Sequence, residues 1–412
     1  MKWGENQLKI IEHRGGNLIV SAAAGAGKTS VLVERILRMI TDPEDGRSLD
    51  QMLIVTFTNL AAGQMRERLF RRISEELDQG CEKGEAEREN LRRQLSLLPG
   101  CSIMTIDAFC LQVLRKYIAL VPGLDPGFRM GDQNEMDLLS ADVLEEVLED
   151  FYEQYDKDPR KEEFGAMAEQ FAGRSEDQDL EPLLLQVYSF MQSMPEPFLW
   201  LEKSVKNYEG HPLYPALRGL ETVLKAFHQA FMEEKMSRGT IQFSDAEHFA
   251  RQILWQDDAP TQAARELSLQ YSEIFIDEYQ DGNMLQEVIL NSFARRDEEG
   301  RAENIFMVGD VKQSIYRFRF AQPELFLQKL EEYHTDRVPR KIFLQKNYRS
   351  RAEVLTGINE IFESLMRREC GGVEYSREQS LIPGGDTPDP DPGMEDFYPK
   401  IYSLSVGENS DQ

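Results

Sequence analysis

Residues 22–29 read AAAGAGKT, and this short stretch decides how the chain folds. The preceding residues 17–22 (NLIVSA) form an apolar run, which favours a buried strand. After the loop, and before the helix-stopping segment 41–43 (TDP), apolar residues recur at helical spacing, namely Val31, Leu32, Ile36, Met39 and Ile40. The sequence therefore predicts a strand, a glycine-rich loop and a helix in succession.

The residue types of this loop suit a bound phosphate. Gly25 and Gly27 let backbone N–H groups turn inward, the helix N-terminus adds partial positive charge, and Lys28 adds a full charge. The Thr29 hydroxyl is placed to ligate Mg²⁺. The residues predicted to surround a nucleotide are Ala22, Ala23, Ala24, Gly25, Ala26, Gly27, Lys28, Thr29 and Ser30. The strict pattern has Gly where this chain has Ala22, and the alternative is a glycine-rich turn with an incidental Lys.

Residues 274–281 (IFIDEYQD) complement this loop. An apolar strand that ends in Asp277 puts a carboxylate at the edge of the sheet beside the loop, where it can hold Mg²⁺. Glu278 is then placed to orient and deprotonate an attacking water. The alternative is a strand that simply ends in solvent. Together with the loop, however, the two acids predict nucleotide hydrolysis.

Composition sets the broad class of the protein. The 412 residues suggest two or three domains, and no apolar run is long enough for a membrane span or a signal peptide. Four scattered cysteines argue against a disulfide framework or a zinc site, and they are Cys81, Cys101, Cys110 and Cys370. A cytoplasmic location is predicted. The net charge of −26 is concentrated at residues 132–181, so a groove elsewhere can still be locally positive.

The order of predicted elements indicates an α/β fold with an inserted helical part. A strand at residues 52–57 precedes a helix capped by Thr58 and Asn59, whose buried stripe is Ala62, Met65, Leu69 and Ile73. Such alternation predicts a parallel sheet covered on both faces. Residues 122–238 read as mostly helical, with a capping box at Asp132 and Glu135. Strands return at residues 273–277 and 304–308, and the chain reads as loop from Leu381.

These segments resemble the UvrD/Rep/Pcr class of superfamily 1 helicases. The motifs are Gln7, TFTNLAAGQMRER (56–68), TIDAFC (105–110), DEYQD (277–281), VGDVKQSIYRFR (308–319) and QKNYRS (345–350). Within that class the chain is most similar to the A subunits of AddAB-type helicase–nucleases. The resemblance implies a RecA-like P-loop fold: residues 1–121 and 239–339 as the first motor domain, 122–238 as a helical insertion, and 340–412 as the beginning of a second RecA-like domain.

The resemblance also implies roles for individual residues. Gln7 is similar to a glutamine that reads adenine, Tyr348 to an aromatic that stacks on it, Gln313 to an amide at the γ-phosphate, and Arg349 to an arginine finger. The implied DNA contacts are stacking by Phe57, Tyr316 and Phe318, phosphate contacts by Thr58, Asn59 and Thr105, and a base or phosphate contact by Arg319.

For some of these residues a purely structural role is the alternative. Phe57 and Phe318 could be core residues, and NYRS could be a capped helix start with a surface Arg. Family members often carry Trp at the position of Phe318 and His at that of Asp107, which leaves the role of Asp107 in doubt. Gln313 and Phe318 are five residues apart, a reach of at most about 17 Å, so one loop can touch both nucleotide and DNA.

The resemblance implies an ATP- and Mg²⁺-dependent 3′-to-5′ DNA motor in recombinational double-strand-break repair. Its partners are single-stranded or duplex-end DNA and a B-type helicase–nuclease partner, with no membrane. Because such A subunits are far longer, we expect a fragment that binds ATP and single-stranded DNA but unwinds poorly. The alternatives are a nucleotide- and DNA-binding module without motor activity and an unrelated P-loop enzyme such as a nucleotide kinase. An RNA substrate is not excluded.

Overall fold

The computed structural model describes residues 3–42, 45–78, 84–154, 161–171, 180–367, 374–375 and 379–385. Its centre is a six-stranded parallel sheet in the order β10-β1-β9-β8-β2-β3. The strands are β1 (Leu18–Ala22), β2 (Met52–Thr56), β3 (Ser102–Thr105), β8 (Glu273–Asp277), β9 (Ile305–Gly309) and β10 (Arg340–Leu344). The parallel sheet predicted from the alternation of strands and helices is thus confirmed.

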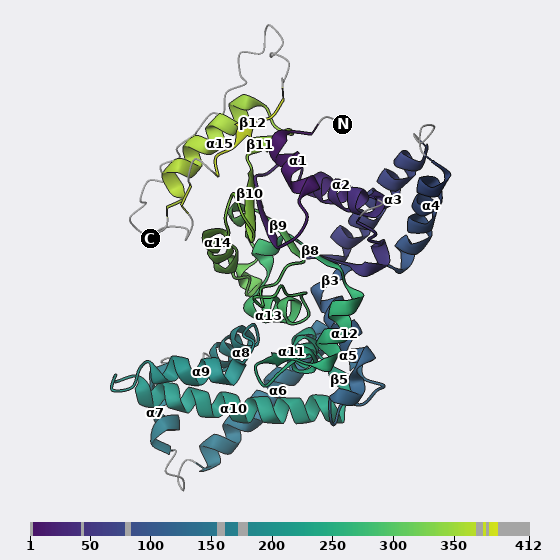
Figure 1. Ribbon diagram of the computed structural model, residues 1–412. Helices are drawn as coiled ribbons and strands as arrows, with labels where there is room; N and C mark the ends of the chain where they lie inside the picture. The colour runs from purple at the N-terminus through teal and green to yellow at the C-terminus, as the bar shows by residue number, and fades with distance from the viewer. Residues whose placement is uncertain are drawn as a thin grey trace.

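Helices cover both faces of the sheet (Figure 1). Side chains alternate between two cores, so that Leu18 and Val20 face one core while Ile19 faces the other. The first core is covered by α1 (Glu5–Glu12), α2 (Lys28–Thr41), α3 (Asn59–Asp78) and α4 (Glu85–Leu97). The second is covered by α5 (Ile106–Lys116), α11 (Phe243–Leu254), α12 (Gln262–Gln270), α13 (Met284–Ser292) and α14 (Pro323–Glu332). Both faces of the sheet are therefore withdrawn from water.

A separate helical unit has its own hydrophobic core. It comprises α6 (Gln133–Gln154), α7 (Lys161–Phe171), α8 (Leu180–Met191), α9 (Pro197–Lys206) and α10 (Tyr214–Ser237), which lie in the lower part of Figure 1. The chain enters and leaves this unit side by side, because β4 (Arg129–Met130) pairs in parallel with β5 (Thr240–Ile241). The described part of residues 122–238 is mostly helical, as the sequence predicted, and the role of this segment as an inserted subdomain stays a prediction.

Predictions that depend on residues within a single helix agree well with the structure. The stripe Ala62, Met65, Leu69 and Ile73 is the buried face of α3. The Thr58 hydroxyl accepts from the Ala61 N–H at 3.1 Å, which caps that helix. The capping box at α6 is only half formed: Asp132 accepts from the Glu135 N–H at 2.9 Å, but the Glu135 carboxylate binds Arg129 at 2.8 Å. A strong local cation thus competes for the carboxylate.

The boundary expected near Arg340 needs a correction. Residues 340–344 do not open a new unit, because β10 pairs with β1 over its whole length, with Leu18 opposite Arg340 and Ala22 opposite Leu344. The first sheet therefore extends to Leu344. Beyond it lie β11 (Lys346–Asn347), α15 (Ala352–Leu365) and β12 (Ile382–Pro383), which pairs with β11. The segment expected to be loop from Leu381 contains β12, and its residues 386–412 lie outside the described part.

The described residues also include a hairpin and several short 3-10 helices. The hairpin strands β6 (Trp255–Gln256) and β7 (Ala259–Pro260) precede α12. Short 3-10 helices lie at Leu49–Gln51, Leu98–Gly100, Ile118–Leu120, Tyr279–Asp281, Val311–Gln313 and Arg317–Arg319. Cys101 and Cys110 are buried free thiols, whereas the positions of Cys81 and Cys370 lie outside the described residues.

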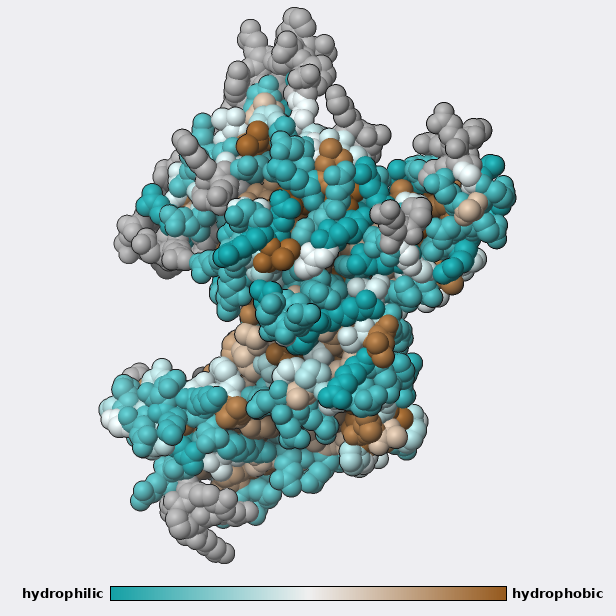
Figure 2. Space-filling view, viewed as in Figure 1, coloured by the Kyte–Doolittle hydropathy of each residue, from teal (hydrophilic) through white to brown (hydrophobic). Residues whose placement is uncertain are grey.

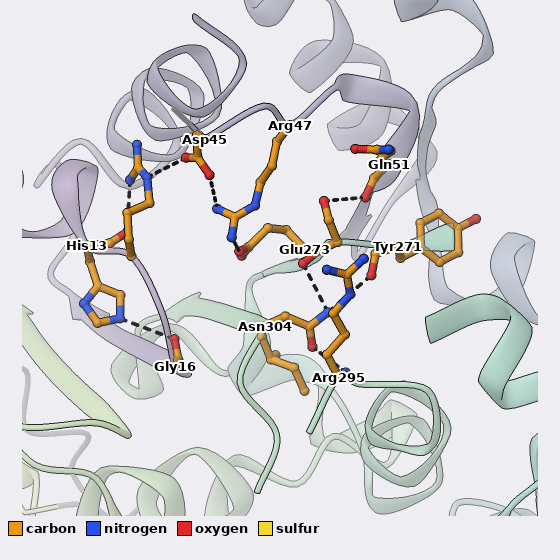
Figure 3. Close-up of polar contacts among 12 residues, drawn as sticks. His13, Gly16, Asp45, Arg47, Gln51, Tyr271, Glu273, Arg295 and Asn304 are labelled. Carbon is orange, nitrogen blue, oxygen red and sulfur yellow. Dashed lines mark hydrogen bonds and ion pairs between the residues drawn. The ribbon is translucent and has the colours of Figure 1, made fainter. Parts of the chain in front are cut away.

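A polar network ties together the amino-terminal ends of the central strands (Figure 3). Glu273, the first residue of β8, lies 3.2 Å from Arg47, which also contacts Asp45 at 3.0 Å. The Asn304 side chain accepts from the Arg295 N–H at 2.8 Å. This network lies at the edge of the sheet opposite the carboxyl ends of the strands, so it supports the sheet from the side away from the phosphate loop.

The surface in Figure 2 is mostly hydrophilic, with hydrophobic residues singly or in small groups. In the described part of the chain, none of the helices combines the length and the apolar character that crossing a bilayer requires.

Candidate functional site

The carboxyl end of β1 leads into the glycine-rich loop. Gly25 and Gly27 have φ of 71° and 83°, the left-handed region that glycine adopts without strain. The helix α2 begins at Lys28, so the backbone turns directly into a helix N-terminus. Ala22, Ala23 and Ala26 are buried, Ala24, Gly25, Gly27, Lys28 and Thr29 are half-buried, and Ser30 is exposed. The predicted geometry of a phosphate loop is present.

Two segments that are distant in sequence meet at this loop. The Lys28 amine donates to both Glu278 carboxylate oxygens, at 2.8 and 3.1 Å. Glu278 directly follows β8, which is separated from β1 by β9 in the sheet. The Asp277 carboxylate accepts from the Glu278 N–H at 3.1 Å. The structure therefore brings Lys28, Asp277 and Glu278 together at the carboxyl ends of the central strands.

The electrostatics of this group favour a bound cation. Burial and the adjacent Glu278 carboxylate raise the pKa of Asp277 to about 6, although the Lys28 ammonium opposes the shift. Glu278 itself has φ of 54° and ψ of 45°, an uncommon backbone conformation for a side-chain-bearing residue. Two crowded carboxylates at the end of a strand are thus held close together at a cost in electrostatic free energy.

Oxygen donors at this edge fit a hard divalent ion. Asp277 offers a carboxylate and Thr29 a hydroxyl, which are the ligand types that Mg²⁺ prefers. Among the described residues, no group of three or more His, Cys, Asp or Glu side chains forms a metal site by itself. A divalent ion at this position would therefore take some of its ligands from the protein and others from the phosphates of a nucleotide, as Mg²⁺ usually does.

A pocket of about 180 Å³ lies next to the loop, between α1 and the segment after β10. Gln7, Gly4, Ala26 and Tyr348 line it. The Gln7 amide oxygen accepts from the Gly4 N–H at 2.9 Å, and its nitrogen donates to the Ala26 carbonyl at 3.2 Å. The structure therefore places Gln7 and Tyr348, the two residues predicted to contact a base, in one pocket.

Asn347 fastens the Tyr348 segment to the phosphate loop, and the sequence reasoning assigned it no role. Its amide nitrogen donates to the Ala24 carbonyl at 2.7 Å, while its oxygen accepts from the N–H groups of Arg349 and Ser350, both at 2.8 Å. A Cβ at Gly25 would lie only 2.8 Å from the Asn347 side chain. The QKNYRS motif contained Asn347, but its partner is 323 residues away.

The hydrogen bonds of Gln313 and Arg349 are made with residues other than Lys28 and Glu278. The Gln313 amide donates to the Asp310 carboxylate at 2.8 Å. Arg349 is exposed, and its backbone rather than its guanidinium contacts Asn347. Their predicted contacts with a γ-phosphate stay predictions.

The residues predicted to contact DNA form a second cluster. The rings of Phe57 and Tyr316 lie 4.5 Å apart, and those of Tyr316 and Phe318 lie 5.8 Å apart. The Arg319 guanidinium lies 5.7 Å from the Tyr316 ring and 5.8 Å from the Phe318 ring. Phe318 is 72% exposed, so the alternative that it is a core residue is wrong.

The polar members of this set occupy two helix N-termini. Thr58 and Asn59 are exposed at the start of α3, whereas Thr105 is buried and caps α5 by accepting from the Ala108 N–H at 3.3 Å. N–H groups at helix starts are suitable donors for phosphate oxygens.

Asp107, whose role was open, faces a second carboxyl group. It forms a side-chain hydrogen bond with Glu247, which is buried on α11 and accepts from Gln286 at 2.8 Å. Burial and the neighbouring Asp107 raise the pKa of Glu247 to about 8, and burial also raises the pKa of Asp107. No pattern in the sequence pointed to this pair.

A parallel sheet with a glycine-rich loop after β1 and acidic residues after β8 defines a P-loop nucleotide-binding protein. A family model described as UvrD/REP helicase N-terminal domain matches residues 3–334. The chain therefore belongs to the UvrD/REP helicase family, and its sheet is the RecA-like core of that family's N-terminal domain.

Curated relatives agree with this assignment. The chain is 33% identical to the A-type subunit of an ATP-dependent helicase/nuclease from Alkaliphilus oremlandii, with 96% of this chain and 42% of that protein covered. Proteins of the same name from Syntrophomonas wolfei and Clostridioides difficile are each 32% identical. The alignments cover 100% and 93% of this chain, and 41% and 40% of the two relatives. The chain thus spans about two fifths of the length of these relatives.

Proposed function

We propose that this chain is an ATP-hydrolysing motor unit that acts on DNA. The observation that carries the proposal is the convergence of Lys28, Glu278 and Asp277 at the sheet edge that also holds the Gln7–Tyr348 pocket. One nucleotide can then place its base in the pocket and its phosphates at the loop. The runs of backbone N–H groups in the loop and at the start of α2 bind the phosphate oxygens.

In the proposed reaction, Lys28 binds the phosphates and leaves Glu278 free to orient and deprotonate the attacking water. Thr29 and Asp277 would hold Mg²⁺, which would neutralise charge on the phosphate oxygens. Gln313 contacts the γ-phosphate, and Arg349 acts as an arginine finger. Gln7 recognises adenine and Tyr348 stacks on it.

For DNA, we propose that Phe57, Tyr316 and Phe318 stack against bases. Stacking contributes about 1–3 kcal/mol per base and tolerates any sequence, which suits a translocating motor. Thr58, Asn59 and Thr105 contact backbone phosphates, and Arg319 contacts a base or phosphate. The cluster of three rings with one guanidinium supports this assignment.

The relatives' name extends the proposal to the whole protein. By analogy with the A-type subunit of an ATP-dependent helicase/nuclease, we propose 3′-to-5′ translocation in double-strand-break repair by recombination, together with a B-type helicase–nuclease partner. The beginning of a second RecA-like domain after residue 344 belongs to the same proposal. A cytoplasmic location stays a prediction.

ATP turnover with and without single-stranded DNA tests the proposal. We expect DNA to stimulate turnover, and Glu278→Gln to abolish it while ATP binding persists, because the amide cannot take up a proton. Glu202→Gln, an exposed change on α9, is the matched control. If the chain binds both ligands without turnover, the binding-module alternative holds. If it binds neither ligand, both assignments fail.

A further inference from the structure

The buried amide of Gln280 links the proposed water-activating residue to the loop that carries the DNA-contacting rings. Gln280 is 1% exposed and lies in the short helix Tyr279–Asp281. Its nitrogen donates to the Glu278 carboxylate at 2.9 Å and to Asp281 at 3.2 Å. Its amide oxygen accepts from the Asp310 N–H at 2.9 Å. One side chain therefore touches both segments.

Asp310, which donates its N–H to Gln280, also contacts Gln313. Its carboxylate accepts from the Gln313 amide at 2.8 Å and pairs with Lys312 at 2.7 Å, and Asp310 is itself 1% exposed. Ser314 adds a further link by donating to the Gln280 carbonyl at 3.5 Å. The chain then continues through Tyr316 to Phe318 at the exposed aromatic cluster. Glu278 and Phe318 are thus joined by a continuous set of hydrogen bonds and a short loop.

The linking residue has to donate one hydrogen bond and accept another, and an amide can do both. Gln can donate to a carboxylate and accept from a backbone N–H at the same time, whereas Glu can only accept when ionised and Met can do neither well. The site is also tightly packed, because a Cβ at Gly309 would lie 2.3 Å from the Gln280 amide oxygen. Gly309 therefore leaves the space in which this side chain sits.

We propose that Gln280 is a positioning residue that couples the nucleotide site to the DNA site. It holds the Glu278 carboxylate and the 310–319 loop in one relative arrangement, so that a nucleotide that draws Lys28 away from Glu278 shifts the loop that carries Phe318. Because coupling between two sites is reciprocal, DNA bound at Phe318 changes the affinity for the nucleotide by the same factor. This inference rests on the proposed function, namely that the two sites bind ATP and single-stranded DNA.

The test measures linkage in the 412-residue chain, and it needs no turnover. The Kd for an oligo-dT strand is measured with and without Mg²⁺ and ATPγS, and the ratio is the linkage factor. We expect a factor of at least about 5 in the native chain, the lower end of typical coupling. Gln280→Met should reduce the factor to below about 2, because the hydrogen bonds of the amide with Glu278 and with Asp310 are both lost. A ratio is compared within each variant, so a general loss of affinity does not mimic this result.

Gly309→Ala reaches the same contact without changing Gln280, and it should also reduce the factor. A folding defect in one variant therefore does not decide the test. The matched controls are Gln328→Met, at an exposed glutamine of α14, and Gly100→Ala, where a Cβ meets nothing within 4 Å. Both should keep the native factor.

The outcomes separate the two proposals. If the native chain binds both ligands but shows no linkage, or if Gln280→Met and Gly309→Ala keep the native factor, Gln280 does not couple the sites and the proposed function stands. If the native chain binds neither ATPγS nor oligo-dT, the proposed function fails, and the inference fails with it.

Discussion

The Lys28 amine lies 2.8 Å from the Glu278 carboxylate, although 250 residues separate the two in the sequence. The pair is partly screened from solvent, with side-chain exposures of 12% for Lys28 and 35% for Glu278. The positive charge of the amine thus partly offsets the negative charge of the nearby carboxyl groups, which belong to Asp277, Glu278 and Asp281. Burial and the Glu278 carboxylate raise the pKa of Asp281 to about 7, which shows how crowded the negative charge is.

Replacing Lys28 should abolish most ATP turnover. Lys28→Met keeps an unbranched side chain of nearly the same length but removes its charge, and loss of one preorganised electrostatic contact typically costs about 100- to 1,000-fold in turnover. Steady-state ATP hydrolysis in the presence of single-stranded DNA measures the effect. Lys225→Met is the control, because Lys225 pairs with Glu221 in the helical unit. Turnover within tenfold of the native rate would contradict the role given to Lys28.

Replacing Phe318 should weaken DNA binding without destabilising the fold. Phe318→Ala removes a ring that is 72% exposed, so little core packing is lost. Loss of one stack of about 1–3 kcal/mol raises the Kd about 5- to 150-fold, and by similar factors for oligo-dT and oligo-dC. Fluorescence anisotropy measures the Kd, and thermal unfolding checks the fold. Leu269→Ala is the matched control at an 82% exposed site on α12. Equal affinity of Phe318→Ala and native chain would rule out stacking.

Replacing Gln7 should reduce the preference for ATP over pyrimidine nucleotides. Gln7 lies with Tyr348 in the pocket beside the phosphate loop. A hydrogen bond to a base is worth about 0.5–1.5 kcal/mol, so Gln7→Ala should lower the ATP/CTP affinity ratio by about 2- to 13-fold. Competition binding with the two nucleotides gives the ratio. Lys9→Ala, on the same helix and paired with Glu5, serves as control. An unchanged ratio would show that Gln7 does not read the base.

The Asp107–Glu247 pair predicts a pH dependence of stability. Because the pKa of Glu247 is raised from 4.5 to about 8 in the folded chain, the native state binds more protons than the unfolded state between these values. The stabilisation is complete below pH 4.5 and is lost as the pH rises through 8. Glu247→Gln removes this titration, so its Tm relative to the native chain should rise from pH 5 to pH 9.

Tm measured by calorimetry across this range checks the prediction, and Glu202→Gln at an exposed position is the control. A difference in Tm between Glu247→Gln and native chain that stays constant with pH would mean that folding does not raise the pKa of Glu247. The groups around the pair are Gln286 of α13, which donates to Glu247, and Arg319, whose positive charge lowers the pKa of Asp107 against the effect of burial.

The sequence predicted those parts of the fold that local pattern decides. The strand–loop–helix around Lys28, the buried stripe of α3 and the strand that ends at Asp277 each follow from the spacing of apolar residues within one segment. The meeting of Lys28 with Asp277 and Glu278 followed from one general rule, that carboxyl ends of parallel strands share an edge of the sheet.

Long-range choices were out of reach of this reasoning. Residues 340–344 read as a strand, but nothing local says that they pair with β1, more than 300 residues earlier. The competition that draws Glu135 to Arg129, the contact of Asn347 with the phosphate loop, and the pairing of Asp107 with Glu247 depend on which side chains the folded chain brings together. Such partners are set by tertiary packing and not by spacing.

The order of the strands also has a consequence for biosynthesis. β1 lies between β9 and β10. Both of these strands are synthesised more than 280 residues after β1. At about 5–20 residues per second, the strand that leads into the phosphate loop waits roughly 15–60 s for its first neighbour. During that interval β1 lacks both of its neighbouring strands, so the phosphate loop takes its place in the sheet only after translation has passed residue 305.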